Sequence, residues 1–389
     1  MRMRRKLLKG IAWNHSRGIM PLLAASQRYN ELHPSVEIQW QKRSLQEFAD
    51  FPIEKLADKF DLLIIDHPWV GCAADTKCVL PLNDYLPAEY LEDQLNNSVG
   101  CSHLSYNYND KQWALAIDAA TPVASYREDL FKDSGTSLPR VWEDVITLAK
   151  ERKVAVPGIA VDILMNFYSF CIAHGNYPFT NEEEVIDQDT GLHAINSMKE
   201  LYGIIEREMF TKNPIAVAEL MSSSNQYWYC PFSYGYSNYS REGYATNALS
   251  YTDVVTFDGT KLKTTIGGTG LAVSASSAHK EISIDFAAMV ASAEFQRTQY
   301  VQNAGQPGHL SAWKDDVANK LANNFFRNLL PAMERAYMRP RYNGYLNFQD
   351  EAGEPLRQCL LNNGDEESTL AEMNKIYRSS LIKTRTSIY

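Results

Sequence analysis

The sequence predicts an α/β protein built from two lobes. Its 389 residues are too many for one ordinary core, so two lobes of roughly 150 to 200 residues each are expected. In the first third, strands alternate with helices, which is the pattern of a largely parallel sheet covered by helices on both faces. The sequence contains no repeat, low-complexity tract or linker.

The first third supplies three predicted strands. Leu7–Trp13 and the apolar run 61–65 indicate strands, and residues 36–43 alternate apolar and polar side chains as a strand does. Helices are predicted over residues 19–32 and 45–59. The carboxyl ends of parallel strands meet at one edge of a sheet, where ligands bind. The loops that follow these strands are therefore expected to converge.

Helices dominate the middle and the end of the chain. Gln226–Pro231 predicts a short strand, and residues 233–238 (SYGYSN) predict a turn-rich aromatic loop. The expected helices are 140–153, 159–175, 192–210, 214–221, 325–337, 344–362 and 366–379.

A Gly-rich segment near residue 270 predicts another strand and two further helices. Gly267, Gly268 and Gly270 precede or begin a run of small and β-branched residues. Residues 278–290 carry apolar side chains at helical spacing. Residues 294–301 continue as a second helix, before a loop rich in Gly and Pro.

The composition is that of a globular protein with an acidic balance. The chain is 45% hydrophobic and 22% charged, and its formal net charge is -9. General binding to nucleic acid or to anionic membranes needs a basic surface, so these partner classes are not expected. No stretch is long and apolar enough to predict a membrane span.

The cysteine pattern argues against a metal site. The spacing of the six cysteines lacks CxxC pairs and zinc-type clusters, so we expect no metal and no cofactor. Cys72 and Cys78 are close enough in sequence to close a small disulfide loop in an oxidising compartment. Free thiols are the favoured interpretation.

Two segments resemble the bacterial extracellular solute-binding proteins that feed sugar-type ABC transporters, the group similar to maltose-binding protein. One is Thr264–Trp313, with its Gly-rich strand, two helices and GQPG loop. The other is YNDKQWALAIDAATPVASYREDLF, residues 108–131. The family pattern there is an aromatic-Gly-Lys turn, a strand ending in Pro-hydrophobic-Asp, small residues, and a helix start. Ala116 stands where a proline is common.

The resemblance implies a two-lobed periplasmic-binding-protein-like fold, with mixed sheets flanked by helices and three hinge crossings. Residues 1–118 and 266–312 would form the first lobe, and residues 119–265 and 313–389 the second. The implied function is binding of a small polar solute, a carbohydrate or a sugar acid, between lobes that close over it. The implied partner is an ABC permease in the membrane, and the protein is expected to be a monomer and not an enzyme.

Three loops at the predicted rim of the first sheet supply candidate ligand-binding residues. The candidates are Trp13, His15, Arg17, Arg43, Asp66 and His67. Arginine offers a planar fork for carboxylates, and Asp and His accept or donate hydrogen bonds. Helix capping and solvated loop positions are the alternative interpretation.

The predicted crossings and the aromatic loop add further candidates. Those near the crossings are Asp118, Gly268, Gln306 and Gly308, and those in the aromatic loop are Tyr234, Tyr236 and Asn238. Aromatic faces stack on sugar rings, and amides read hydroxyl orientation. Asp118 suits sugar hydroxyls, with a hinge hydrogen bond as the alternative.

Near the C-terminus, the segment MRPRYNGY contributes Arg339, Arg341 and Tyr345. Convergence of Arg17, Arg339 and Arg341 would favour an anionic ligand such as a sugar acid. The alternative interpretation of this segment is a solvated connection between helices.

Two other functions stay open. One is a cytoplasmic enzyme on the same body, with Cys230 as a nucleophile, and the other is an intracellular ligand sensor. The start MRMRRK is basic but is not followed by a long apolar segment. The resemblance implies a periplasmic protein if an export signal was trimmed, and the sequence implies a cytoplasmic one if this start is complete.

Overall fold

The computed structural model describes residues 5–44 and 52–386, with the side chains of residues 382–386 excepted. The chain divides into two compact units. Unit 1 comprises Met1–Ala120, Ile266–Glu334 and Arg341–Asn343. Unit 2 comprises Thr121–Thr265, Arg335–Pro340 and Gly344–Tyr389.

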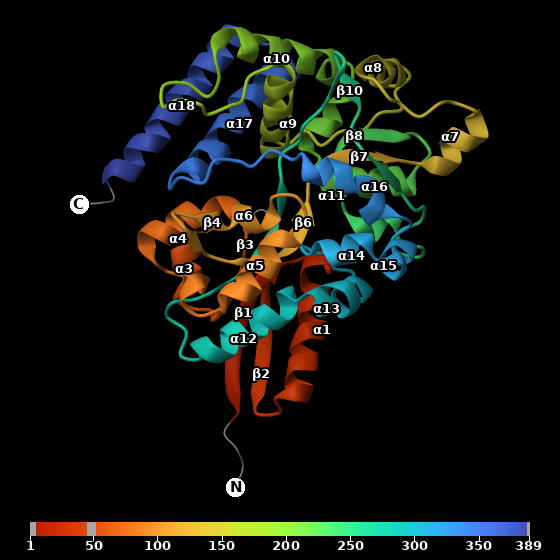
Figure 1. Cartoon of the computed structure of the whole chain (residues 1–389). Coiled ribbons are helices and arrows are strands. Elements are labelled where there is room, and N and C mark those ends of the chain that lie inside the picture. The colour runs from red at the N-terminus through yellow and green to blue at the C-terminus, as the bar shows by residue number, and fades with distance from the viewer. Residues whose placement is uncertain (1–4, 45–51, 387–389) are drawn as a thin grey trace. The chain divides into compact units, whose positions relative to one another are not determined.

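Unit 1 is organised around a mixed five-stranded sheet in the order β2-β1-β3-β12-β6 (Figure 1). β1 (Lys6–Trp13), β2 (Val36–Arg43) and β3 (Leu62–Ile65) run parallel. β12 (Gly267–Val273) lies antiparallel to β3 and to β6 (Leu115–Ala120). All four residues of β3 are buried, because a central strand has neighbours on both edges and helices against the sheet.

Helices α1 (Ser16–Leu32) and α12 (Lys280–Ala291) pack against this sheet and contact each other. Tyr29 joins them: its hydroxyl donates to Asp285 at 2.7 Å, and its ring meets Phe286 edge-on. Within the part of unit 1 that the structure describes, the other α-helices are α3 (Ile53–Ala57), α4 (Val70–Thr76), α5 (Ala88–Asn96), α6 (Ser102–Ser105), α13 (Ala293–Phe295), α14 (Leu310–Lys314), α15 (Asp316–Leu321) and α16 (Phe325–Glu334). A hairpin is formed by β4 (Asn107–Tyr108) and β5 (Lys111–Gln112).

Unit 2 contains a three-stranded antiparallel sheet in the order β8-β7-β9. Its strands are β7 (Pro122–Tyr126), β8 (Tyr229–Tyr234) and β9 (Ser250–Thr252). A parallel bridge between Val154 and Tyr229 extends it. A separate hairpin consists of β10 (Thr256–Phe257) and β11 (Thr260–Lys261).

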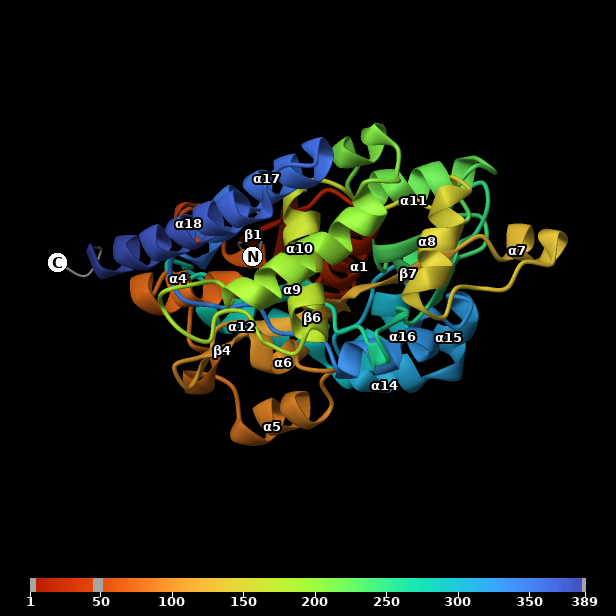
Figure 2. The same ribbon diagram turned by 90° about the horizontal axis from the view of Figure 1, so that it is seen from above.

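Helices make up most of unit 2. α9 (Ala160–Ala173) is buried along most of its length and packs on α10 (Gln188–Tyr202) and α17 (Tyr345–Asn362). α18 (Glu366–Thr386) lies along α17 and α10 (Figure 2). The remaining helices are α7 (Glu128–Ser134), α8 (Trp142–Lys150) and α11 (Pro214–Ser223).

The predicted strands of the first third are confirmed as β1, β2 and β3. Of the helix predicted over residues 45–59, α3 (Ile53–Ala57) is present, and residues 45–51 lie outside the described residues. The strand predicted at Gln226–Pro231 begins later and extends to Tyr234, because Tyr234 pairs with Pro122 of β7.

The third change of unit lies further along the chain than the predicted boundary at residues 312–313. Residues 313–334 belong to unit 1, because Trp313 is buried and its indole donates to the Pro307 carbonyl at 2.7 Å. Asn319 donates in turn to the Trp313 carbonyl at 2.8 Å. The chain changes unit between residues 334 and 344, where it passes to unit 2, returns for Arg341–Asn343, and passes back.

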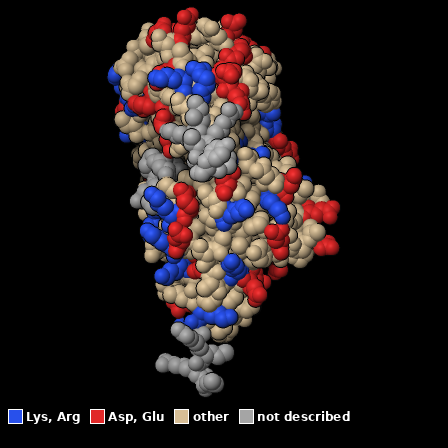
Figure 3. Space-filling view, turned by 90° about the vertical axis from the view of Figure 1, so that its left-hand side faces the viewer, with Lys and Arg blue, Asp and Glu red and all other residues tan. Residues whose placement is uncertain are grey.

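Among the described residues, the structure contains no helix with the length and apolar character of a membrane span. On the face shown in Figure 3, acidic and basic side chains are interspersed. This surface accords with a polar exterior of mixed charge.

Candidate functional site

The loop after β1 brings Trp13, His15 and Arg17 into one cluster. His15 caps α1 by accepting from the Arg17 backbone N–H at 3.1 Å, and its ring stacks on Trp13 at 5.3 Å. A Cβ at Gly18 would lie 2.3 Å from the Trp13 indole nitrogen, so glycine is required for this packing. Burial, helped by the Arg17 charge, lowers the pKa of His15 to about 4. The imidazole is therefore neutral at physiological pH.

Arg17 and Asp118 form a buried two-pronged ion pair. Arg17 Nε donates to one carboxylate oxygen at 2.8 Å and Nη2 to the other at 2.5 Å. The residues are 3% and 2% exposed. Burial raises the pKa of the Asp118 carboxyl, and the Arg17 guanidinium opposes that rise. Each group balances the charge of the other, so the pair presents little net charge to a ligand.

The other rim candidates of unit 1 bind their own scaffold. Arg43 Nη2 donates to the Ile64 carbonyl at 2.9 Å. Asp66 caps a short 3-10 turn by accepting from the His67 backbone N–H at 2.8 Å, and His67 Nδ1 lies 3.2 Å from the same oxygen. His67 is buried and meets the Tyr106 ring edge-on. Asp66 thus takes the capping role that the sequence left open.

The candidates near the strand crossings hold β12 and the segment 306–308 against the backbone of β6. Gly268 has φ +110, and a Cβ there would lie 2.2 Å from the Asp118 carbonyl oxygen. Gln306 Nε2 donates to the Ala119 carbonyl at 2.8 Å, and Gly308 N–H donates to Gln296 Oε1 at 2.8 Å. The segment 306–308 lies along β6, and both glycines allow this close approach.

In unit 2 the aromatic loop holds a buried amide. Tyr234 ends β8, with its hydroxyl 3.2 Å from that of Thr265. Tyr236 is buried and meets Tyr239 edge-on. Asn238 is 0% exposed, and neither its amide nitrogen nor its amide oxygen has a hydrogen-bond partner among the described residues. A buried amide without a partner is costly, so this position has a specific reason to carry asparagine.

The MRPRYNGY candidates do not form one cluster. Arg339, in unit 2, donates to Gln349 Oε1 at 2.8 Å. Tyr345, also in unit 2, is fully buried, with its hydroxyl 3.3 Å from that of Tyr168. Arg341, in unit 1, donates to the Leu104 carbonyl at 2.9 Å and to the Asn107 carbonyl. Arg341 therefore fastens a loop of unit 1.

The structure groups the predicted site residues by unit. Unit 1 holds Trp13, His15, Arg17, Arg43, Asp66, His67, Asp118, Gly268, Gln306, Gly308 and Arg341. Unit 2 holds Tyr234, Tyr236, Asn238, Arg339 and Tyr345.

Comparison with known proteins identifies the family. The model of the family described as bacterial extracellular solute-binding protein matches residues 12–297. The chain belongs to this family. No curated protein sequence matches this solute-binding protein.

Solved structures agree over nearly the whole chain. Maltose-bound MalE3 of T. maritima has a TM-score of 0.83 at 16% identity, covering 96% of this chain and 99% of that one. A ribitol complex of an ABC transporter solute-binding protein from Agrobacterium radiobacter has a TM-score of 0.82 at 17% identity, covering 97% and 99%. The GacH receptor of Streptomyces glaucescens, solved unliganded and with acarbose, has a TM-score of 0.78 at 17% identity, covering 97% and 98%. At these identities the likeness shows the fold, and it confirms the predicted two-lobed α/β class.

Cys230 of this solute-binding protein is poorly suited to nucleophilic chemistry. It lies within β8 and is 0% exposed. Burial raises the pKa of its thiol to about 12, and the Asp162 charge adds to the rise. The nucleophilic form of cysteine is the thiolate, which is scarce here at neutral pH. The described residues also contain no group of three or more His, Cys, Asp or Glu placed to hold a metal.

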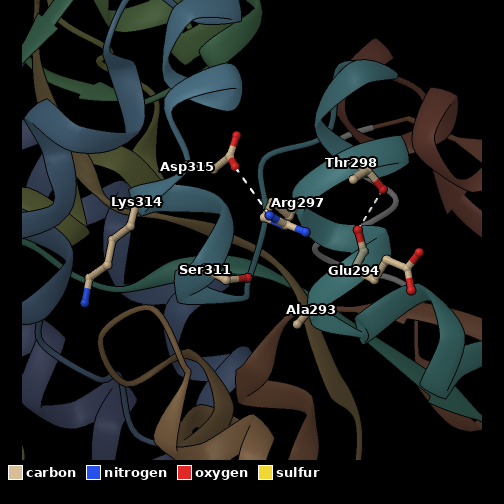
Figure 4. Close-up of a pocket in the computed structure, with 7 residues that line it drawn as sticks. All are labelled: Ala293, Glu294, Arg297, Thr298, Ser311, Lys314 and Asp315. Carbon is tan, nitrogen blue, oxygen red and sulfur yellow. Dashed lines mark hydrogen bonds and ion pairs between the residues drawn. The ribbon is translucent and has the colours of Figure 1, made fainter.

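Unit 1 also has a surface hollow beside α13 and α14 (Figure 4). Arg297 lies 3.8 Å from Asp315 across it. The Thr298 hydroxyl donates to the Glu294 carbonyl at 2.7 Å. These groups pair within the hollow, and we assign it no ligand.

Three residues that contact or position the candidate site residues were missed by the sequence analysis. Gly18 permits the Trp13 packing, and Gln296 anchors Gly308. Burial raises the pKa of Tyr300, and the nearby Asp118 charge adds to the rise. Gln296 and Tyr300 lie in a π-helical turn, Gln296–Tyr300, and such turns are frequent at functional sites. The sequence alone does not predict this π-helical turn, because the pattern of its residues is that of an ordinary α-helix.

Proposed function

We propose that this solute-binding protein captures a small neutral solute of the carbohydrate or polyol class. The observation that carries the proposal is the Asn238 amide, which is buried in the aromatic loop with both polar atoms unbonded among the described residues. A sugar hydroxyl both donates and accepts, so one hydroxyl or a neighbouring pair satisfies such an amide. Tyr234 and Tyr236 lie on the same loop and supply aromatic surface of the kind that sugars stack on.

The hydrogen bonds and ion pairs that the arginines already make support a neutral ligand over a sugar acid. Arg17 is neutralised by Asp118, and Arg341 donates to backbone carbonyls. Arg339 donates to Gln349 and Arg43 to the Ile64 carbonyl. A site built for a carboxylate would hold such guanidinium groups ready for the ligand.

The similar structures agree with this class of ligand. These proteins were solved in complex with maltose, ribitol and acarbose. We extend the ligand class to this chain, together with ligand capture between the two units. From unit 1 we propose Trp13 as a ligand contact. His15 stacks on its ring, whose centre lies 5.8 Å from the Arg17 guanidinium carbon.

We propose further that the liganded protein delivers its solute to an ABC permease, acting as an exported monomer without turnover of the ligand. Fractionation of the native cell tests the location. Ligand-dependent stimulation of ATP hydrolysis by the reconstituted permease tests delivery. Recovery of chemically altered ligand would contradict a pure binding role.

A thermal-shift screen tests the ligand class. Neutral sugars, polyols, sugar acids and amino acids are titrated, and the melting temperature is followed against concentration. A ligand that binds only the folded state raises the melting temperature as its concentration exceeds the dissociation constant. We expect a neutral sugar or polyol to do so. A response restricted to sugar acids, or to amino acids, would overturn the proposal.

Asn238→Leu tests the residue, with Tyr345→Phe as the matched control from the interior of unit 2. Loss of one or two hydrogen bonds to a ligand is expected to weaken binding by about ten- to a hundredfold. Titration calorimetry of both variants with the best ligand measures this loss. Equal affinity in Asn238→Leu and the parent protein would remove Asn238 from the site.

A further inference from the structure

We infer that Cys72 and Cys78 form a dithiol that closes to an intramolecular disulfide, a site of reversible covalent modification on unit 1. All six cysteines lie among the described residues, and all six are free thiols in this structure. The inference rests on how the chain turns back at the end of α4, and on Glu54 and Thr76, which lie near both thiols.

The C-terminal cap of α4 directs Cys78 back toward Cys72. Lys77 ends the helix in the left-handed region, with φ 53 and ψ 30, and its N–H donates to the Ala73 carbonyl at 2.9 Å. In this type of cap, the residue after the left-handed position commonly contacts the last turns of the helix, three or four positions before its end. Those positions are Cys78 and Cys72.

Cys78 is held in this place by the sheet. Its carbonyl accepts from the Ala275 N–H at 2.9 Å, and Val79 bridges to Ser274 directly after β12. The partner on the helix is fixed as well, since Cys72 lies within α4. The two Cβ atoms are therefore on rigid elements joined by a short turn, which favours ring closure over pairing with a distant thiol.

Both thiols share the same polar neighbours. Cys72 Sγ lies 3.5 Å from Glu54 Oε2. The Thr76 hydroxyl donates to the Cys72 carbonyl at 2.7 Å and lies near enough to both thiols to lower their pKa. Both cysteines are half-buried, so a small disulfide reagent has access to them. Burial and the Glu54 carboxylate raise the pKa of both thiols. Glu54 thereby slows the reaction, because thiolate is the attacking species.

The closing reaction needs a disulfide as oxidant, and glutathione disulfide supplies it. One cysteine loses its proton, attacks a glutathione sulfur, and releases glutathione thiolate. The second thiolate then attacks the protein sulfur of the mixed disulfide. It forms the Cys72–Cys78 bond and releases the second glutathione. Two protein thiols are oxidised, one glutathione disulfide is reduced, and two protons leave.

Mass spectrometry of the whole protein, equilibrated with glutathione disulfide and alkylated, tests the inference. Before alkylation, we expect the oxidised protein to be roughly 2 Da lighter than the reduced protein. After alkylation, it should carry two fewer alkyl groups than the alkylated reduced protein. Trypsin cuts after Lys77, and a second digestion with Glu-C, which cuts after Glu89 and Glu92, separates Cys78 from Cys101. The disulfide must then join the peptide that carries Cys72 to the short peptide that begins at Cys78. Cys101, also half-buried in unit 1, is the control and should remain outside this bond.

Two variants sharpen the test. Cys72→Ser should leave Cys78 as a glutathione mixed disulfide and abolish the joined peptides. Glu54→Gln should speed closure several-fold, because it removes the charge that raises the pKa of both thiols. Alkylation of both cysteines after equilibration, lasting mixed disulfides at both, or pairing of either with Cys101 would each overturn the inference.

Discussion

The buried polar groups at the strand ends of unit 1 and those around the β8 sheet and the aromatic loop of unit 2 differ in their hydrogen bonding. In unit 1, Arg17 pairs with Asp118, and Gln306 bonds the Ala119 carbonyl. In unit 2, Asn238, the Tyr229 hydroxyl and Asp162 Oδ2 are buried without a hydrogen-bond partner among the described residues. The polar groups at these strand ends of unit 1 thus bond the scaffold, whereas the named groups of unit 2 keep unused hydrogen-bonding capacity in the interior.

The difference has a thermodynamic meaning. A paired buried group stabilises little in net terms, but removal of one partner is costly. An unpaired buried group destabilises the fold, and its removal in a matching shape is neutral or favourable. Variants at these positions of the two units should therefore shift stability in opposite directions.

Breaking the Arg17–Asp118 pair should give the largest effect. Arg17→Met leaves a buried carboxylate without its partner, and we expect a loss of about 3–5 kcal/mol in the free energy of unfolding. Urea denaturation measures the loss. The double variant Arg17→Met/Asp118→Leu should lose much less, since no unpaired charge remains. A single variant as stable as the parent protein would show that the pair contributes nothing.

Asp162 should make the stability of unit 2 depend on pH. Burial raises its pKa from 3.8 to about 8 in the folded protein. Between these values the folded state keeps a proton that the unfolded chain has lost. The stability contribution of Asp162 is therefore fully present below pH 4 and is lost as pH rises towards 8, by up to about 1.4 kcal/mol per pH unit.

Asp162→Asn removes this titration. The slope of unfolding free energy against pH should flatten in the variant, and its advantage over the parent should grow from pH 4 to pH 8. Denaturant unfolding across that range measures both slopes. Cys230→Ala serves as the control from the same buried region, because its thiol, with a pKa of about 12, does not titrate there. Parallel slopes in Asp162→Asn and the parent would contradict the assignment.

The fold was largely predictable because it depends on local pattern. The alternation in residues 36–43 and the apolar run of β3 reflect sheet geometry directly. The third change of unit was misplaced because Trp313 gains its place from a contact with Pro307 and from later helices. An apolar residue in the sequence indicates that its side chain is buried, but it does not indicate in which unit.

The candidate site was less predictable because its polar residues choose partners through the tertiary fold. Arg17 and Asp118 were each assigned to a ligand, yet they are 101 positions apart and bond each other. Asp66 adopted the capping alternative, which is a local effect. Tyr345 follows MRPRY in sequence but lies among Tyr168 and other aromatic residues of unit 2.

Asn238 and Gln306 give a matched comparison of smaller size. Asn238→Leu should raise the unfolding free energy by about 1–2 kcal/mol, because it removes an unbonded buried amide. Gln306→Leu should lower it by about 1–3 kcal/mol, because the Ala119 carbonyl loses its donor. Urea denaturation without ligand measures both. Losses of equal size in the two variants would show that the amides are equivalent and that the contrast between the two regions fails.

Tyr345→Phe should have the smallest effect and separates core from site. The substitution keeps the ring in its cluster with Phe179 and Phe348 and removes only the hydroxyl, which lies 3.3 Å from that of Tyr168. We expect a loss of about 1 kcal/mol or less in unfolding free energy and an unchanged dissociation constant for any ligand found by the screen. Tyr236→Phe, in the aromatic loop, should instead weaken ligand binding with little effect on stability. If Tyr345→Phe weakened binding and Tyr236→Phe did not, the ligand contacts of unit 2 would lie beside the helices that surround Tyr345, and not in the Asn238 loop.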